Sequence, residues 1–318
     1  MPEPMRLVFC GTPQFAVPTL SALLQAGHRV ELVLSQPDRA SGRGMEVQIS
    51  PVKRHAEQHG LELTQPDKIR NNTELQERLK ALSPDAIVIV AYGRLIPPWM
   101  LNLPKHGNLN VHASLLPKYR GAAPIQWAVA NGETGTGITT MRIDEGLDTG
   151  DILLQERVAI LPQQTAVELS PVLAEMGAHL MVRTLAGLEQ GTLQATPQDH
   201  SRATMAPILQ REDGRINWSR TAQQIFDRWR GFQPWPGAFT SFRGRKLIFH
   251  AMQVVADAPE SSTEPGTLRR AGNRLLVACG EGTWLDLLEL QMEGKRRMPV
   301  EAFLNGISLA DGDRLDPR

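Results

Sequence analysis

The stretch RLVFCGTPQFAVPTLSALLQAGHRVELVL, residues 6–34, decides the fold of this chain. Its residues 6–10 are mostly apolar and predict a buried strand, and the Gly-Thr-Pro turn at 11–13 supplies a helix cap and a helix-starting proline. Apolar residues at helical spacing predict a helix over 14–26, and the apolar run 30–34 predicts a second strand. This β-α-β order predicts two parallel strands joined by a right-handed crossover.

The same alternation continues to about residue 190. Further strands are expected at 61–63, 86–91, 109–111, 137–143 and 151–160, and further helices from Ser50-Pro51 and over 73–82, 124–131 and 165–190. Helices that alternate with mostly apolar strands are typical of an α/β fold. We therefore predict an α/β domain with a parallel sheet over residues 1–190.

The second half of the chain has a different character. Residues 191–208 are polar, rich in threonine and interrupted by Pro197 and Pro207, which is typical of a linker. Short strand-like runs follow a helix near 221–231, at 238–242, 246–255, 266–269, 274–279 and 284–290. They predict a small β-barrel or sandwich over residues 209–318.

The composition is that of a folded protein, since 41% of the 318 residues are hydrophobic and 21% are charged. No apolar run approaches the roughly 18 residues that a membrane span needs, so no contact with a membrane is expected. Cys10 and Cys279 are isolated, lie in apolar segments and have no metal-type spacing. We expect both to be reduced core residues of a cytoplasmic protein that holds no metal and is a monomer.

The charges are balanced overall but segregated in the second half. Lys and Arg together number 34, as do Asp and Glu, yet residues 202–250 carry nine basic against three acidic residues. Residues 251–294 carry three against seven. The concentrated basic part favours contact with nucleic acid, and a solvated charged surface is the alternative.

A strand followed by a glycine turn and a helix invites comparison with dinucleotide-binding folds. Those folds need the spacing G-x-G-x-x-G, whereas residues 11–16 read GTPQFA. Proline at the second glycine position is bulky and lacks an N–H, which works against close approach of a pyrophosphate. We therefore expect no bound NAD.

Asn110 and His112 lie at the end of the strand predicted at 109–111. Alternation in an extended segment points both side chains to the same side, at the strand end where open parallel sheets bind ligands. An acid from the loop between the next two strands would orient such a histidine and favour its charged form. Three aspartates of that loop are candidates: Asp144, Asp148 and Asp151. The structural alternatives are a pair that hydrogen-bonds loop backbone and an aspartate that forms a turn with its own backbone.

The motifs around these residues resemble those of a known family. NVHASLLPKYRG at 110–121 and LDTGD at 147–151 resemble the active-site signature of 10-formyltetrahydrofolate-dependent formyltransferases. The resemblance implies that Asn110, His112 and Asp148 act together at the formyl group, with 10-formyltetrahydrofolate as donor and without a metal. It also implies a Rossmann-like parallel-sheet formyltransferase domain followed by a smaller C-terminal β-barrel of the oligonucleotide-binding type.

Further motifs resemble the branch of this family that formylates methionyl-tRNA. They are GTP at 11–13, QPDR at 36–39, GRG at 42–44, SPVK at 50–53, GAAPIQ at 121–126 and PWPGA at 234–238. The resemblance implies that the acceptor is charged initiator Met-tRNA and that the barrel binds tRNA. Two alternatives stay open. One is the same chemistry on another amine, such as an amino-sugar nucleotide or glycinamide ribonucleotide; the other is a noncatalytic RNA- or nucleotide-binding protein with the same fold.

The resemblance and the local charges also predict binding residues. Folate contacts are expected from the SLLP turn and from the segment after strand 86–91, namely Ser114, Leu115, Leu116, Pro117, Tyr92, Arg94 and Ile96. tRNA contacts are expected from Arg43, Lys118, Arg120, Arg228, Arg245, Lys246 and Arg296. Arg43 lies in the long loop 35–53, which we expect to form a lid over the acceptor end of the tRNA. Relatives often carry lysines after the GRG motif, whereas this chain has Met45 and Glu46 there.

Overall fold

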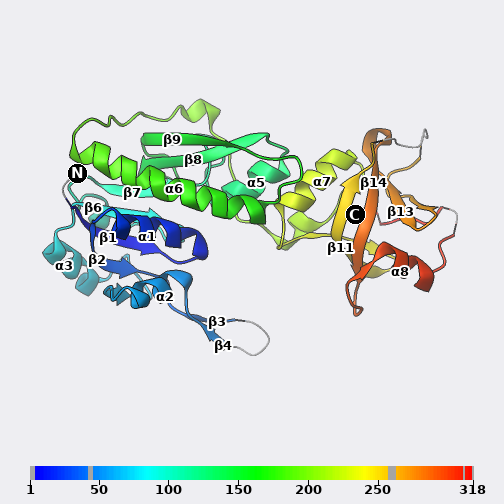
Figure 1. The fold of residues 1–318 in the computed structure, drawn as a ribbon, viewed down its shortest axis with the longest axis horizontal. Coiled ribbons are helices and arrows are strands. Elements are labelled where there is room, and N and C mark those ends of the chain that lie inside the picture. Colours follow the sequence, from blue (N-terminus) through cyan, green and yellow to red (C-terminus); the bar gives the residue numbers. More distant parts are fainter. Residues whose placement is uncertain (1–3, 42–45, 257–262, 311, 317–318) are drawn as a thin grey trace. The chain divides into compact units, whose positions relative to one another are not determined.

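A computed structural model describes residues 4–41, 46–256, 263–310 and 312–316 of the protein. The chain divides into two compact units (Figure 1). Unit 1 consists of Met1–Pro124, Gly135–Ala159 and Glu168–Pro207, and unit 2 consists of Ile125–Thr134, Ile160–Val167 and Ile208–Arg318. Most of the predicted linker therefore packs with unit 1. The functional division at residues 190 and 208 stays a prediction.

Unit 1 is built on a sheet that is parallel over most of its width. Among the described residues, seven strands follow the order β5-β2-β1-β6-β7-β8-β9. Strands β5, β2, β1, β6 and β7 run parallel to one another, whereas β8 pairs antiparallel with β7 and β9 pairs antiparallel with β8. From β1 the chain moves outward to β5 and then crosses to β6 on the other side of β1, as in doubly wound folds. The predicted Rossmann-like sheet is confirmed.

The strand bounds in unit 1 agree with the predicted runs to within a few residues. They are β1 Arg6–Gly11, β2 Arg29–Leu34, β5 Leu63–Thr64, β6 Ala86–Val90, β7 Asn108–His112, β8 Gly135–Arg142 and β9 Ile152–Ala159. A separate hairpin, β3 Arg39–Ser41 with β4 Glu46–Gln48, lies in the loop that we predicted as a lid. The residues between β3 and β4, including Arg43, lie outside the described part of the chain.

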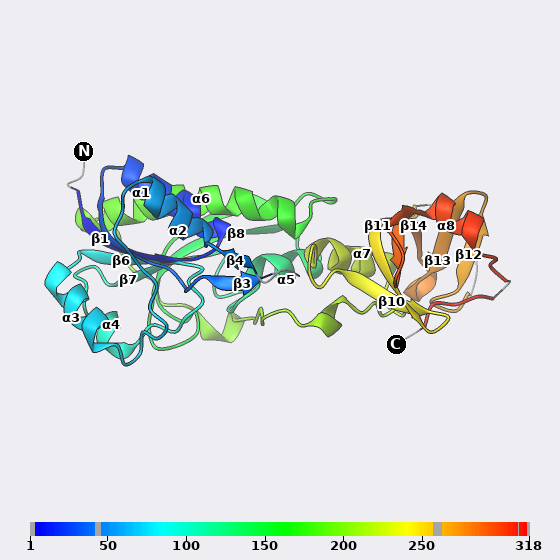
Figure 2. The ribbon, with the colours of Figure 1, turned by 90° about the horizontal axis from the view of Figure 1, so that it is seen from below.

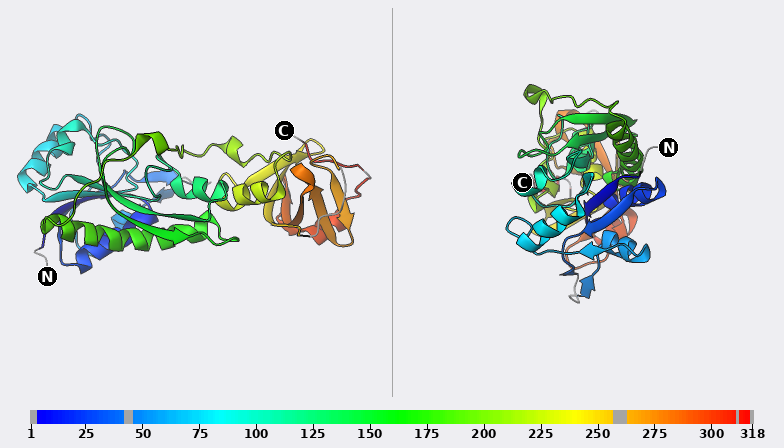
Figure 3. Two further views of the ribbon diagram at one scale, coloured as in Figure 1. Left: turned by 90° about the horizontal axis from the view of Figure 1, so that it is seen from above. Right: turned by 90° about the vertical axis from the view of Figure 1, so that its left-hand side faces the viewer.

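Helices cover both faces of this sheet. On one face lie α1 (Val17–Gln25), α2 (Pro51–Gln58) and α6 (Ala166–Glu189), and on the other lie α3 (Thr73–Leu82) and α4 (Pro98–Leu101), as Figure 2 and Figure 3 show. Because both faces are covered, the central strands β1 and β6 are buried along nearly their whole length. No helix within the described residues is long and apolar enough to cross a membrane.

The turn after β1 differs from the predicted helix cap. Gln14–Ala16 form a short 3-10 turn, and α1 begins only at Val17, with Pro18 in its first turn. The Thr12 hydroxyl caps neither helix, since it accepts a hydrogen bond from the Gln36 N–H at 3.2 Å. Thr12 therefore ties the carboxyl end of β1 to that of the neighbouring strand β2.

Unit 2 contains an antiparallel sheet. In its described part six strands pair, with β10-β11-β14-β13-β12 in a row and β15 beside β14. The bounds are β10 Ala238–Phe242, β11 Arg245–Val254, β12 Leu268–Ala271, β13 Arg274–Ala278, β14 Trp284–Met292 and β15 Met298–Pro299. Helix α7 (Ala222–Gly231) packs on β11, and α8 (Val300–Gly306) packs on β13 and β14. A smaller β unit after the α/β unit is confirmed, and its closure into a barrel stays a prediction.

Both cysteines lie in the interior. Cys10 of β1 is 0% exposed, and Cys279, directly after β13, is 1% exposed. Burial raises the pKa of both thiols, that of Cys279 to about 12. Since the thiolate is the reactive form, we predict that neither cysteine reacts with dithionitrobenzoate in the native protein and that both react after unfolding in guanidinium. Rapid reaction of either thiol in the native protein would contradict this packing.

Candidate active site

Strand β7 brings two predicted catalytic residues to the carboxyl edge of the parallel strands. Asn110 pairs with Ile89 of β6, and His112 is the last residue of β7. The two residues are separated by one position of an extended segment, so their side chains lie on the same face. Asn110 is half-buried, and its side-chain amide has no hydrogen-bond partner in the described part of the chain. That amide is therefore available to a ligand.

The His112 ring, which is 5% exposed, is held between two groups. Its Nε2 lies 2.9 Å from the Tyr119 carbonyl oxygen, and because a carbonyl only accepts, Nε2 carries a proton. Its Nδ1 lies 3.6 Å from Oδ2 of Asp148. A neutral ring in this orientation has Nδ1 as a proton acceptor, and a charged ring forms an ion pair with the carboxylate.

Asp148 lies in the loop between β8 and β9. Besides facing His112, its Oδ2 accepts a hydrogen bond from the Gly121 N–H at 2.8 Å. Its backbone is left-handed, with φ of 53°, which aspartate tolerates better than most residues. Asp144 instead accepts a hydrogen bond from the Gly146 N–H at 3.0 Å and so forms a turn with its own loop. The structure thus pairs Asp148, rather than Asp144, with the histidine.

The SLLP turn after β7 is fixed by side chains from β8 and β9. The Thr139 hydroxyl donates to the Ser114 carbonyl at 2.7 Å and accepts from the Leu116 N–H at 3.1 Å. Gln155 donates to the Leu116 carbonyl at 2.9 Å. The Ser114 hydroxyl is itself used internally, because it donates to a backbone carbonyl four residues on at 2.6 Å. The residues of this turn that remain half-buried are Leu115 and Pro117.

The segment after β6 leaves the sheet at the same edge. Tyr92 is 1% exposed and packs in the apolar core, and its burial raises the pKa of the phenol. Arg94 donates to the Asp67 carbonyl at 2.5 Å, and Ile96 is half-buried against the same core. Leu95, by contrast, is 84% exposed. The Tyr92 ring therefore packs in the core, and its contact with folate stays a prediction, whereas Leu95 offers an apolar surface at this edge.

Two basic residues predicted as tRNA contacts, Arg120 and Lys118, differ in their surroundings. Arg120 is 6% exposed, and its Nε and Nη2 donate to Gln198 Oε1 at 3.1 and 2.6 Å. Its Nη2 also lies 3.0 Å from Nδ1 of His200. The Arg120 guanidinium is therefore hydrogen-bonded inside unit 1, and its contact with tRNA stays a prediction. Lys118, in contrast, is exposed.

The residues that lie near the end of β7 belong to a part of the chain that matches a protein-family model. The family model described as "Formyl transferase" matches residues 5–185, which include Asn110, His112 and Asp148. The chain belongs to the formyl transferase family. A second model, described as "Formyl transferase, C-terminal domain", matches residues 208–308. The predicted resemblance is thereby confirmed.

Named relatives match this formyltransferase over almost its whole length. The methionyl-tRNA formyltransferase of Acidobacterium capsulatum is 64% identical over 311 residues, which cover 98% of this chain and 99% of its own. The methionyl-tRNA formyltransferase of Koribacter versatilis is 57% identical, with 98% of each chain covered. A solved N-formyltransferase from Helicobacter canadensis, in complex with folinic acid and dTDP-3-aminofucose, has a TM-score of 0.66 at 18% identity. That structure covers 91% of this chain and 99% of its own, and it shares the fold.

Unit 2 of this formyltransferase carries the remaining basic residues. The Lys246 Nζ lies 4.0 Å from the centroid of the Phe239 ring, and burial together with the nearby Arg211 lowers the pKa of this lysine. Arg245 is exposed and donates to a backbone carbonyl at 2.6 Å. Arg296 is exposed in the turn after β14. The guanidinium carbon of Arg215 lies 5.8 Å from the same centroid, so two cations lie near the Phe239 ring.

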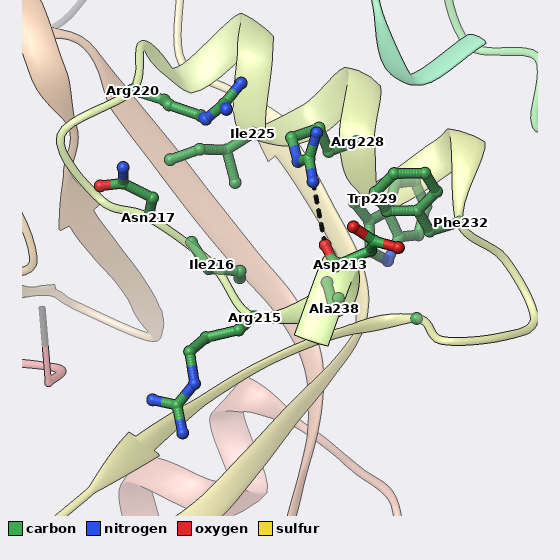
Figure 4. Close-up of a pocket in the computed structure, with 12 residues that line it drawn as sticks. Asp213, Arg215, Ile216, Asn217, Arg220, Ile225, Arg228, Trp229, Phe232 and Ala238 are labelled. Atoms are coloured by element: carbon green, nitrogen blue, oxygen red, sulfur yellow. Dashed lines mark hydrogen bonds between the residues drawn. The ribbon is translucent and has the colours of Figure 1, made fainter. Parts of the chain in front are cut away.

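Arg228 of α7 lines a small pocket within unit 2 (Figure 4). Its Nη2 donates to the Asp213 carbonyl at 3.1 Å, and its guanidinium carbon lies 4.7 Å from the centroid of the Phe232 ring. Burial lowers the pKa of Arg228. Arg220, which also lines the pocket, is exposed. The Arg228 side chain is therefore partly buried, whereas Arg220 is exposed to solvent.

Several residues that hold the site were missed by the sequence reasoning: Thr139, Gln155 and Gln198. A signal existed for Thr139, because a polar residue in a strand that is otherwise buried usually has a hydrogen-bonding task. Gln198 carried no such signal, since it lies in a stretch that is polar throughout and was interpreted as a linker.

Proposed function

We propose that this chain transfers the formyl group of 10-formyltetrahydrofolate to the α-amino group of charged initiator Met-tRNA. The observation that carries this proposal is the 64% identity, over 98% of the chain, to a methionyl-tRNA formyltransferase. Two features support the chemistry. His112 Nδ1 lies 3.6 Å from Asp148 Oδ2, and His112 shares the end of β7 with Asn110. As part of the same proposal, the enzyme acts as a monomer in the cytoplasm.

Formyl transfer needs stabilisation of a developing negative charge. The amine nitrogen attacks the formyl carbon, and the oxygen of the resulting tetrahedral intermediate becomes an oxyanion. A fixed hydrogen-bond donor aimed at such an oxygen is typically worth about 10²- to 10³-fold in rate. The Asn110 amide suits this task because it is held on β7 and has no side-chain partner among the described residues.

The reaction also needs a proton to move. The amine nitrogen loses a proton as its bond to the formyl carbon forms, and N10 of the folate gains one as its bond to that carbon breaks. His112 Nδ1 suits both steps, because Nε2 is already protonated and bound to the Tyr119 carbonyl. Asp148 stabilises the imidazolium that exists between the two steps. No covalent bond to the protein is required.

The folate donor would bind along the two segments that leave β6 and β7. The pterin is flat and edged with hydrogen-bonding groups, so it suits backbone groups between apolar walls. Leu95 at 84% exposure and the half-buried Leu115 and Pro117 supply such walls. We keep Arg94 and Ile96 as proposed folate contacts, because the backbone of their segment would bind the pterin. Ser114 and Leu116 instead fix the shape of the turn.

The proposed function is tested by offering the enzyme several acceptors. The protein is incubated with 10-formyltetrahydrofolate and, separately, charged initiator Met-tRNA, uncharged tRNA, an amino-sugar nucleotide and glycinamide ribonucleotide. Formyl groups are expected on Met-tRNA alone. Formylation of a small amine but not of Met-tRNA would refute the choice of acceptor and keep the chemistry.

We propose that basic residues of unit 2, among them the exposed Arg245 and the half-buried Lys246, contact tRNA phosphates. Replacing Arg245 and Lys246 together with alanine is expected to weaken Met-tRNA binding and to lower the slope of log affinity against log salt by about one to two. The reason is that each phosphate contact releases roughly one counterion. Anisotropy titrations at a series of KCl concentrations measure the slope, and the KM for 10-formyltetrahydrofolate should stay unchanged.

The matched control is Arg183→Ala, which removes an exposed cation of α6 that pairs with Glu156. This variant should keep the wild-type salt slope. If the Arg245 and Lys246 double variant also keeps it, these two residues do not contact phosphates. Lys118, Arg220 and Arg296 are then the next cations to test.

A further inference from the structure

Residues 119–121 hold both catalytic side chains through their backbone. The Tyr119 carbonyl accepts from Nε2 of His112 at 2.9 Å, and the Gly121 N–H donates to Oδ2 of Asp148 at 2.8 Å. The position of this short segment therefore sets the separation of the imidazole and the carboxylate.

A distant part of the chain fixes this segment. The Arg120 N–H donates to the Thr204 carbonyl at 2.8 Å, and the Arg120 carbonyl accepts from the Ala206 N–H at 2.7 Å. The Tyr119 N–H donates to the Thr204 hydroxyl at 2.9 Å. Residues 204–206, predicted as part of a linker, thus run beside the segment and belong to the scaffold of the site.

Gln198 joins this scaffold to the loop that carries the catalytic acid. Its Nε2 donates to the carbonyls of Asp148 and Gly150 at 2.9 and 2.7 Å. Its Oε1 accepts two hydrogen bonds from the Arg120 guanidinium, at 3.1 and 2.6 Å. Two N–H groups and two lone pairs of the amide are thereby engaged in an environment where the side chain is only 6% exposed. Rotation of the amide would set its NH₂ against the guanidinium, so Arg120 fixes its orientation.

We propose that Gln198 is a positioning residue for formyl transfer, which acts through Asp148 and from there on His112. The loop needs such support, because Asp148 has a left-handed backbone with φ of 53°. Gln198 holds the backbone of Asp148, while Gly121, next to Arg120, holds its carboxylate. The Gln198 side chain therefore links the backbone of Asp148 to Arg120, the neighbour of the residue whose N–H binds the Asp148 carboxylate. The inference rests on the proposed function.

The first test is Gln198→Met, which keeps a similar length and removes all four hydrogen bonds. The kcat for Met-tRNA formylation is expected to fall by about 10- to 100-fold, as a misplaced catalytic group predicts, while both KM values change by less than about threefold. In the same variant, the ¹⁵N chemical shifts of the His112 ring should move toward those recorded for Asp148→Asn. This spectroscopic measurement needs no acceptor, so it remains decisive if Met-tRNA is the wrong substrate.

A second variant and a control separate positioning from general destabilisation. Gln198→Glu keeps two acceptors for Arg120 but has no N–H for the two carbonyls, and it should also lose kcat. The control Thr184→Val removes a buried hydroxyl of the same unit that lies 2.7 Å from the Thr140 hydroxyl, and it should keep both kcat and the His112 signals. Three results would each overturn the proposal: wild-type kcat in a folded Gln198 variant, unshifted His112 signals, or loss of the folded state in both variants.

Discussion

Replacing His112 with alanine is expected to lower the single-turnover rate of formyl transfer by about 10³-fold, within the range of a positioned acid–base group. The expectation follows from the two ring contacts. Nε2 is committed to the Tyr119 carbonyl, so Nδ1 is the nitrogen that can take the amine proton and return it to N10 of the folate. Alanine removes that nitrogen. Rapid-quench measurements with saturating donor and enzyme in excess over Met-tRNA give the rate.

His28 offers a matched control for this variant. It is a buried histidine of the same unit, 7% exposed, and its Nδ1 accepts from the Met5 N–H at 3.2 Å. His28→Asn should lower stability and leave the transfer rate within about threefold of wild type, since no reacting group is removed. If His112→Ala kept more than about a tenth of the wild-type rate, His112 would not be the proton carrier.

The fold was predictable wherever burial leaves a clear pattern of apolar residues in the sequence. Strand β6, Ala86–Val90, is buried on both faces, and its sequence AIVIV is an unbroken apolar run. Helix α8 and strand β15 were missed because they are too short for a period to stand out; β15 spans only Met298–Pro299. The cap expected at Thr12 was wrong because the hydroxyl meets Gln36, a residue that only the neighbouring strand brings close.

The site was predictable where its members are neighbours in sequence. Asn110 and His112 share one strand, so alternation alone placed them on one face. Local sequence could not choose the acid, because the loop holds three aspartates and only packing decides which one meets the ring. The burial of Arg120 was not predictable, since arginine is mostly exposed and its partner Gln198 lies 78 residues away. Contacts over such separations leave no trace in a local pattern.

Replacing Asp148 with asparagine is expected to lower the transfer rate by about 10²- to 10³-fold with little loss of stability. Asparagine has the same shape and also tolerates the left-handed backbone at φ of 53°. Its amide oxygen can still accept from the Gly121 N–H. What disappears is the negative charge 3.6 Å from His112 Nδ1, so the imidazolium formed during transfer loses its ion pair. Single-turnover rates and thermal unfolding, measured on the same preparation, separate the two effects.

The same loop contains the controls, because Asp144→Asn and Asp151→Asn each remove one negative charge close to the site in sequence. Asp144 accepts from the Gly146 N–H and the Thr149 hydroxyl, bonds that an amide oxygen can keep. Asp151 joins β8 through its backbone carbonyl, which accepts from the Arg142 N–H at 2.9 Å. Both variants should therefore transfer formyl groups within about threefold of the wild-type rate. Equal losses at all three positions would assign the effect to the net charge of the loop, and a loss at Asp148 alone assigns it to the contact with His112.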